Sequence, residues 1–352
     1  MQDATLKVRG ERLTLVSIAV CVRDGVDWID GCMESLVNQT HPELEIILVD
    51  DGSSDGSEQK VETWSKHALV TVITQDALGL SAGRMAALEA SKGEWFAITD
   101  IDVRPETDWI QRMLESSNSS EGEDVVAVTG RTIFRRSDDV ISRIRSIEIE
   151  SKYRSRPRRT NLANGPCSMF KRESLLAVGG FDPSWYHAED MEVSLKLIQS
   201  GGIIVYSPDA VVNHVPETGL KRFLGKRKRD ARAHVRIHRR YKLLRNGHDF
   251  IGSSWVVLWM APLLTLLAIA IYLYLITLSG YQSIGMKSLY YSLTREVLLI
   301  SVAPLYWLLS FSRSDLPKKG IYSNLVLLSW SLALWQGIML GYVDALLRRN
   351  GH

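Results

Sequence analysis

Two carboxylates, Asp100 and Asp102, end an apolar run in the sequence FAITDID at residues 96–102. Side chains at positions i and i+2 of a strand point to the same side, so these two would lie together. Like charges at that separation repel each other, which destabilises the fold unless a cation lies between them. Because carboxylate oxygens suit hard divalent cations, the pair predicts a site for Mg²⁺ or Mn²⁺.

The residues around this pair predict the sheet that must position it. Apolar strand-like runs alternate with helix-like runs, and the strand-like runs are at 13–22, 44–51, 69–75 and 94–100. Such alternation, with strands that are apolar almost throughout, predicts an open α/β sheet of mostly parallel strands covered by helices. Ligands of these sheets bind beyond the carboxyl ends of the strands, where this chain carries charged residues after three strands.

No glycine-rich phosphate loop follows the first of these strands. The sequence VCVRDGVDW at residues 20–28 has neither the dinucleotide-binding nor the P-loop spacing of glycines. If the ligand is a nucleotide diphosphate, we therefore expect a divalent cation, rather than a glycine cradle, to hold its phosphates.

Composition divides the chain of 352 residues into unlike parts, although its net charge is only +2. Residues 1–12 read as an N-terminal tail that makes a poor secretory signal. The three cysteines have neither disulfide nor metal-site spacing, which suits a reducing compartment: Cys21, Cys32 and Cys167.

The last hundred residues contain segments that could cross a membrane. Residues 254–278 carry no charge, and residues 321–347 carry one aspartate, so each is long enough to span a hydrocarbon core of about 30 Å. Residues 297–311 either cross as well or lie at the interface. We expect two or three transmembrane helices within 251–348, and three in the preferred interpretation.

A basic segment, residues 221–250, precedes the first span and is expected to lie at the membrane interface. Residues 221–245 hold twelve lysines or arginines and one aspartate. Positive charge next to a span favours the cytoplasmic side, so we expect a multi-pass protein of the cell membrane with its soluble domain, residues 13–220, in the cytoplasm. Nucleic-acid binding is the rival interpretation of basic residues, and the adjoining span argues against it.

Five blocks of residues 13–220 resemble the family 2 glycosyltransferases in order and approximate spacing. The resemblance implies the GT-A fold, a nucleotide-binding half followed by an acceptor half, and the transfer of a sugar from a nucleotide diphosphate with inversion. The blocks are VSIAVCVRDG, SLVNQTHPELEIILVDDGSSDGS, GLSAGRMAALEASKGEWFAITDIDVRP, VGGFDPSWYHAEDMEVSLKLIQSG and YSPDAVVNHVPE.

The resemblance implies which residues would hold the nucleobase. Asp50 would hydrogen-bond the base, with Asp51 beside it. Val22 and Arg23 stand where the family often has threonine and tyrosine. This difference leaves the choice between uracil and guanine open, so the donor is a UDP-linked or a GDP-linked sugar.

The resemblance also implies how the diphosphate and the metal would be held. Asp100 would lie by the ribose and the metal, and Asp102 would bind the metal between the two phosphates. Arg84 would face the diphosphate, or else lie on the helix surface. His214 would be a further metal or phosphate contact, or a structural residue at a strand end.

The acidic pair Glu189-Asp190 matches the pair that precedes a helix in the family. An inverting displacement needs a base to take the proton of the acceptor hydroxyl, and we predict Asp190 in that role, with Glu189 reaching the acceptor. The pair would also stabilise the N-terminus of a helix. Trp185 and Tyr186 would either stack on a sugar ring or pack in the core.

The sequence argues against a processive polymer synthase. Long-chain synthases of the family carry the pattern Gln-x-x-Arg-Trp, whereas the aligned residues 226–230 read KRKRD. This stretch keeps an arginine, Arg229, which becomes an acceptor-site candidate, but lacks the glutamine and the tryptophan.

The preferred interpretation is a membrane-bound enzyme that adds one sugar to a hydroxyl of a lipid-linked acceptor, and the expected acceptors are those built on polyprenyl chains. Basic residues in 143–159 and 221–245 would suit a lipid phosphate or simple docking to anionic lipid. Transfer directly onto a polyprenyl phosphate is the main alternative, but that nucleophile is already an anion and would need no base. A nucleotide-sugar-binding protein without activity and a transporter are two further alternatives.

Overall fold

The structure is a computed structural model, and it describes residues 14–118, 123–185, 187–241, 254–284 and 321–347. The chain forms two compact units. The first comprises the chain up to Ile133 together with Arg156–Val215, and the second comprises Phe134–Ser155 and the chain from Pro216 onward. The second unit thus takes a segment that lies inside the predicted domain of residues 13–220.

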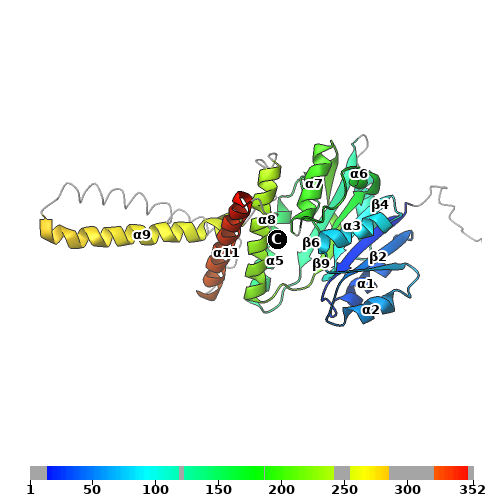
Figure 1. The fold of residues 1–352 in the computed structure, drawn as a ribbon, viewed down its shortest axis with the longest axis horizontal. Coiled ribbons are helices and arrows are strands. Elements are labelled where there is room, and N and C mark those ends of the chain that lie inside the picture. The colour runs from blue at the N-terminus through cyan, green and yellow to red at the C-terminus, as the bar shows by residue number, and fades with distance from the viewer. Residues whose placement is uncertain (1–13, 119–122, 186, 242–253, 285–320, 348–352) are drawn as a thin grey trace, which may run out of the picture. The chain divides into compact units, whose positions relative to one another are not determined.

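A mixed sheet forms the centre of the first unit (Figure 1). Its strand order is β3-β2-β1-β4-β8-β6-β9-β5, and β7 pairs with β9. The four strands predicted from the alternating pattern, β1 to β4, run parallel, whereas β8 pairs antiparallel with β4 and β6. The strands are β1 (Val16–Val22), β2 (Leu44–Asp51), β3 (Val70–Gln75), β4 (Trp95–Asp100), β5 (Val103–Pro105), β6 (Val125–Phe134), β7 (Arg159–Thr160), β8 (Ser168–Lys171) and β9 (Ile203–His214).

Helices cover both faces of this sheet. Alternate residues of β1 point to opposite faces, so that Ile18 packs in one apolar cluster and Ala19 in another. Met33 of α1 belongs to the first cluster and Leu88 of α3 to the second. The predicted α/β architecture is therefore confirmed. The helices are α1 (Ile29–Val37), α2 (Ser57–Trp64), α3 (Leu80–Ala90), α4 (Trp109–Asn118), α6 (Arg172–Ala177) and α7 (Glu189–Gln199).

The second unit is helical. It contains α5 (Val140–Arg154), α8 (Leu220–Arg240), α9 (Ser254–Ile284) and α11 (Ile321–Leu346). All four contribute to one apolar cluster, in which Phe223 of α8 meets Trp330 of α11 edge-on, with ring centroids 5.2 Å apart. Within the described residues, two helical segments are long and apolar enough to cross a membrane, Val257–Ile276 and Tyr322–Leu346. The expected third segment, residues 297–311, lies outside the described residues.

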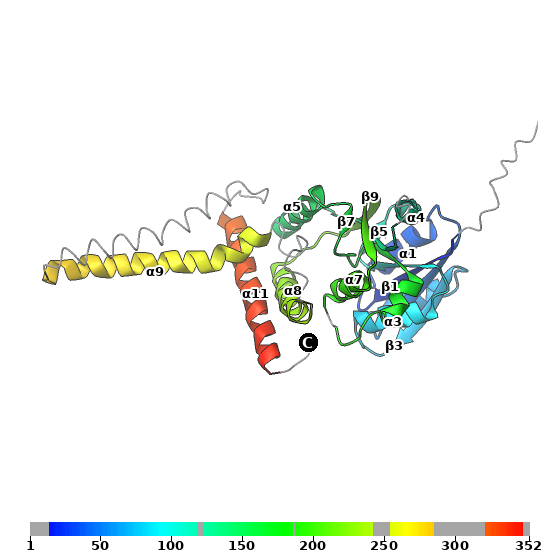
Figure 2. The same ribbon diagram turned by 90° about the horizontal axis from the view of Figure 1, so that it is seen from above.

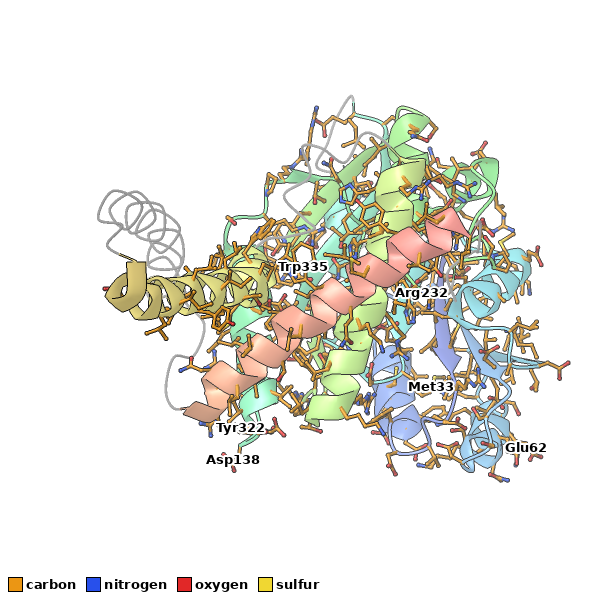
Figure 3. The ribbon with its side chains drawn as sticks, turned by 60° about the vertical axis from the view of Figure 1, so that its left-hand side comes forward. Met33, Glu62, Asp138, Arg232, Tyr322 and Trp335 are labelled. Carbon is orange, nitrogen blue, oxygen red and sulfur yellow. The ribbon has the colours of Figure 1, made fainter. Side chains whose placement is uncertain are left out.

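Helix α8 lies against α11 at a very short separation (Figures 2 and 3). Two glycines of α11 make this approach possible. A Cβ atom on Gly337 would be 2.8 Å from the Cβ of Ala231, and one on Gly341 would be 2.7 Å from the Cβ of Val235. Residues 221–240 of the predicted basic segment therefore form a helix that packs closely on a candidate membrane span, and residues 242–250 of the segment lie outside the described residues.

An ion pair joins the same two helices. Arg232 of α8, labelled in Figure 3, donates two hydrogen bonds to Asp344 of α11, one of 2.5 Å from Nε to Oδ2 and one of 2.7 Å from Nη2 to Oδ1. The carboxylate side chain is only 10% exposed. Because the two planar groups meet through two parallel bonds, this contact fixes the register between the helices as well as their proximity.

Candidate active site

Arg84, on α3, joins two carboxylates that are distant in the sequence. Its guanidinium lies 2.9 Å from Oδ1 of Asp100, at the end of β4, and 2.6 Å from Oε1 of Glu189, at the start of α7. The Arg84 side chain is 2% exposed. Burial alone lowers its pKa, but Glu189 and Asp100 outweigh burial and raise the pKa above its usual value, so the guanidinium stays charged.

The acidic pair at the start of α7 is held by backbone groups. Oδ2 of Asp190 accepts a hydrogen bond of 2.9 Å from the backbone N–H of Gly165, and Oδ1 accepts one of 2.8 Å from that of Met191. The chain reaches this position through Ala188, whose φ of 62° is in the left-handed region that non-glycine residues rarely adopt. The turn thereby places the Glu189 carboxylate next to Arg84 and the Asp190 carboxylate next to Gly165.

Burial controls the protonation of this pair. It is the largest influence on Glu189 and Asp190, and it raises the pKa of both carboxyl groups. The positive charge of Arg84 opposes this effect for both groups, but it does not outweigh burial. A buried carboxylate with a raised pKa is a stronger base than an exposed one, which suits proton abstraction near neutral pH.

Gly165 is a site residue that the sequence did not single out. Its backbone N–H binds Asp190, and its carbonyl lies 3.4 Å from the Arg84 guanidinium. A Cβ atom here would come within 3.2 Å of that guanidinium. The only available signal was its place in the segment ANGPCSMF, residues 163–170, which resembles the family's donor-lining segment.

Asp102 and His214 form the second group of polar side chains. Oδ1 of Asp102 lies 3.4 Å from Nε2 of His214, and the pairing of β5 with β9 places them together. Nδ1 of His214 lies 2.8 Å from the carbonyl oxygen of Val215. If that nitrogen carries the proton, the Nε2 lone pair faces the carboxylate, and a lone pair and a carboxylate oxygen are both ligands for a divalent cation.

This donor set fits a metal that is shared with a ligand. Among the described residues, no group of three or more acidic, histidine or cysteine side chains could hold an ion. A cation at Asp102 and His214 would therefore complete its coordination with other oxygens, such as those of a diphosphate and water. Asp100 remains a candidate ligand of the metal, although one of its carboxylate oxygens already accepts a hydrogen bond from Arg84.

The predicted base-binding residues lie at the ends of β1 and β2. Val22 and Asp50 are opposite each other in the parallel register, and both are buried, whereas Arg23 is exposed. Asp50 accepts a hydrogen bond of 3.1 Å from the backbone of Ser53. The contact of these residues with a nucleobase stays a prediction.

Asp51 organises the turn that leads into α3. Its carboxylate accepts hydrogen bonds from the backbone of Leu78 at 2.8 Å and of Gly79 at 2.9 Å, and from the Gln75 side chain at 2.6 Å. Gly79 has a φ of 95°, in the region that favours glycine. Since α3 carries Arg84, Asp51 acts on the candidate site through the position of this helix.

The predicted acceptor residues belong to different units of the chain. Trp185 is fully buried, and its carbonyl accepts a hydrogen bond from the Ser81 hydroxyl, which favours the packing role that the sequence left open. Arg229 is exposed on α8 of the second unit. Tyr186 lies outside the described residues.

Comparison with known proteins identifies the family. The model for glycosyl transferase family 2 matches residues 17–179, and the model for glycosyl transferase family group 2 matches residues 111–343, which is more than half of the chain. The chain belongs to the family 2 glycosyltransferases. The resemblance predicted from the five sequence blocks is thereby confirmed.

A solved structure supports the GT-A fold of this family 2 glycosyltransferase. The chain is similar to the mannosyltransferase PcManGT from Pyrobaculum calidifontis, solved in complex with GDP-Man and Mn²⁺. The TM-score is 0.55 at 18% identity, and the match covers 96% of this chain and 88% of PcManGT. At that identity the likeness concerns the fold alone.

Curated relatives match a shorter stretch of the sequence. EpsH of Bacillus subtilis, which is provisionally named a glycosyltransferase, is 40% identical over 103 residues, or 29% of this chain and 30% of EpsH. The cholesterol galactosyltransferase of Borreliella burgdorferi is 32% identical over 112 residues, or 32% of this chain and 31% of that protein. The chain thus spans about a third of the length of each of these relatives.

Proposed function

We propose that this family 2 glycosyltransferase transfers one sugar from a nucleotide diphosphate to a hydroxyl group of a lipid-linked acceptor, with inversion at the anomeric carbon. The observation that carries the proposal is the position of Arg84. One guanidinium lies within 2.9 Å of Asp100, expected at the donor, and of Glu189, next to the expected base. Groups for both halves of the reaction therefore surround one residue.

Asp190 would act as the general base. Its carboxylate, oriented by the N–H groups of Gly165 and Met191, would accept the proton of the acceptor hydroxyl. The acceptor oxygen then bonds to the anomeric carbon as the bond from this carbon to the diphosphate oxygen breaks, and the nucleotide diphosphate leaves with the electron pair. The acidic pair supports a hydroxyl acceptor, because a lipid phosphate would need no base.

Asp102 and His214 would hold Mg²⁺ or Mn²⁺, with Asp100 close to the ribose. When bound, such an ion neutralises the charge that develops on the departing diphosphate. The Mn²⁺ and GDP-Man of the PcManGT complex support a metal and a nucleotide sugar for the present chain. Uracil and guanine both remain candidates for the base of the donor.

The second unit would anchor the protein in the cell membrane, with the first unit on the cytoplasmic side. The two apolar helices α9 and α11 support the anchor, and exposed basic residues of α8, such as Lys221 and Arg239, would face anionic head groups. The name of the cholesterol galactosyltransferase supports a lipid as acceptor. Within that class we propose a polyprenyl-based carrier.

The variant Asp190→Asn tests the proposed base. It keeps the size of the side chain but cannot take a proton, so sugar transfer should fall by at least about 100-fold, while metal-dependent binding of the nucleotide diphosphate stays close to that of the wild type. Released nucleotide diphosphate is measured in a screen of donors, with membrane lipid extract as acceptor.

The control is Asp108→Asn, which alters an exposed ion pair with Arg112 of α4 and should leave transfer unchanged. Full turnover by Asp190→Asn would contradict the hydroxyl acceptor and favour transfer onto a lipid phosphate. Absence of metal-dependent nucleotide binding by the wild type would contradict the donor site itself.

A further inference from the structure

The second unit contains a cavity of about 110 Å³ whose lining is polar on one side and apolar on the other. The polar side comes from α5 and α8 and includes Glu148, Lys152, Arg227 and Asp230. The apolar side comes from α9 and α11 and includes Trp330. Nothing in the proposed transfer reaction uses this cavity.

The formal charges of the lining cancel. Lys152 lies 2.7 Å from Glu148, and Arg227 lies 3.2 Å from Asp230. Burial opposes ionisation of Glu148, but Arg145 and Lys152 outweigh burial and lower its pKa below the ordinary range, so it stays charged. Burial lowers the pKa of the neighbouring His234 to about 4, so this imidazole is neutral near pH 7. The lining therefore presents two positive and two negative groups.

Two buried donors of the lining have no acceptor among the described residues. They are Nε of Arg227, whose side chain is 7% exposed, and Nε1 of Trp330, which is 1% exposed. Buried donors are almost always paired, because an unpaired one loses its hydrogen bond to water without replacement. A ligand with acceptor oxygens in this cavity would provide partners for both donors.

The apolar side of the cavity fits the methylene groups of a small head group. Leu258 of α9 and Leu334 of α11 line the cavity, and both helices carry exposed apolar residues along the segments that could cross a membrane. An engineered cavity of about 150 Å³ holds one benzene molecule, so the present cavity accepts a small group and not a complete lipid. The ligand is an amphiphile whose head alone enters.

We propose that this cavity binds the head group of a zwitterionic phospholipid. The phosphodiester oxygens accept hydrogen bonds from Arg227 and Trp330, and the ammonium group faces Glu148 or Asp230. A purely anionic head would bring a negative charge to a lining whose cations are already paired, and such a buried charge is unfavourable. The site requires the membrane attachment proposed above, but not the sugar transfer, so the two proposals fail independently.

The test uses the full-length protein in detergent and measures lipid binding by native mass spectrometry. The lipids are phosphatidylethanolamine, phosphatidylglycerol and a polyprenyl phosphate. Trp330→Phe removes the indole N–H and keeps an aromatic ring against Phe223. Loss of one hydrogen bond should weaken phosphatidylethanolamine binding by about 3-fold to 10-fold and leave phosphatidylglycerol binding unchanged.

The matched control is Trp335→Phe on the same helix. Its indole N–H donates to the carbonyl of Leu258 at 2.7 Å, and its ring does not line the cavity, so phosphatidylethanolamine binding should stay at the wild-type level. Arg227→Lys, which keeps the charge but removes Nε, is the second test and should weaken binding like Trp330→Phe.

Three results would overturn the proposal. If phosphatidylethanolamine binding is unchanged in both Trp330→Phe and Arg227→Lys, these two donors do not bind the lipid. An equal or larger effect on phosphatidylglycerol or on the polyprenyl phosphate would identify an anionic ligand. An equal loss in Trp335→Phe would assign the effect to helix packing.

Discussion

Arg84 holds the candidate active site together because it is the common partner of two buried or partly buried carboxylates. Without it, Glu189 and Asp190 would lie close to Asp100 with no positive charge between them, and like charges in a buried setting repel strongly. Burial of Arg84 without its partners would be equally unfavourable. The arginine therefore contributes to the stability of the first unit as well as to the arrangement of its site.

We expect Arg84→Met to lower the free energy of unfolding by roughly 3–5 kcal/mol, because removal of one member of a buried ion pair leaves the other uncompensated. Thermal unfolding in detergent measures the change. The control is Arg112→Met on α4, where the side chain is 45% exposed and its pairs contribute little. Similar unfolding temperatures for the two variants would contradict this account of Arg84.

The pH dependence of sugar transfer should reflect the raised pKa of the acidic pair. Asp190 acts as a base only when ionised, so activity is lost as the pH falls through its pKa. Since burial raises that pKa, the acidic limb of the kcat/KM profile should lie above the ordinary aspartate value of 3.8. A limb at or below pH 4 would show that Asp190 is not the residue that titrates.

Glu189 and Asp190 also make stability depend on pH, in the direction opposite to that expected for activity. A carboxyl group whose pKa is higher in the folded state binds its proton more tightly there. Its contribution to stability is therefore complete at low pH and is lost as the pH rises through the folded-state pKa. The proposed base would thus be kept at the cost of some stability at neutral pH, as is common for residues that do chemistry.

The residues of the site could be predicted more readily than their contacts. Asp100, Glu189 and Asp190 stand out because they lie in sequence blocks that resemble the family, although an acidic pair also stabilises the N-terminus of a helix. The bridge through Arg84 could not be predicted, because it depends on how α3 lies between β4 and α7. The glycine at position 165 could not be predicted either, because the requirement for it comes from the close approach of the Arg84 guanidinium, which is distant in the sequence.

Among the described helices of the second unit, α8 and α11 have the most extensive mutual contact. Gly337 and Gly341 bring the two helix backbones together, and Arg232 and Asp344 fix their register. A glycine pair at this spacing in an apolar helix commonly indicates contact between two membrane helices. Here the partner is a basic helix, so the pattern identifies a close contact but not the kind of helix that makes it.

Gly337→Val should separate these helices. The new side chain would overlap α8, and overpacking of this kind costs about 1–3 kcal/mol, so the unfolding temperature in detergent should fall. Gly225→Ala is the matched control, because no described atom lies within 4 Å of a Cβ at this position of α8. It should leave the unfolding temperature unchanged or raise it. An unchanged unfolding temperature for Gly337→Val would contradict the close contact between α8 and α11.

The parallel strands could be predicted from the sequence because each is a separate apolar run. The antiparallel insertion of β8 between β4 and β6 could not, since pairing between residues such as Phe96 and Phe170 depends on contacts across the whole unit. From the sequence, the basic residues in 143–159, which overlap α5, were expected to be able to bind lipid phosphates. In the structure Arg145 and Lys152 pair with Glu148, which a count of basic residues does not reveal.

At the scale of the molecule, the chain combines a GT-A-like unit with a helical unit that we propose to be embedded in a membrane. Two apolar segments of 20 and 25 residues are each sufficient to cross a hydrocarbon core of about 30 Å. The predicted boundary near residue 220 marks the start of α8, but the helical unit also includes α5. A single cut along the sequence cannot describe this division.

We expect the protein to stay in the membrane fraction after washing with high salt and alkaline carbonate, and to be released by detergent. Salt weakens the attraction between basic residues and anionic lipids, but it does not weaken the burial of apolar helices. Immunoblots of the soluble and membrane fractions measure the outcome. Release by salt alone would show that α8 binds the membrane surface and that α9 and α11 do not cross it.

The contact between Arg232 and Asp344 has a consequence for biosynthesis. The two residues are 112 positions apart in the chain. At a translation rate of about 5–20 residues per second, the ribosome needs roughly 6 to 22 seconds to make the second after the first. Throughout that interval the newly made α8 lacks the helix that covers it, and translation that pauses before α11 would leave its apolar side available to chaperones or to the lipid surface.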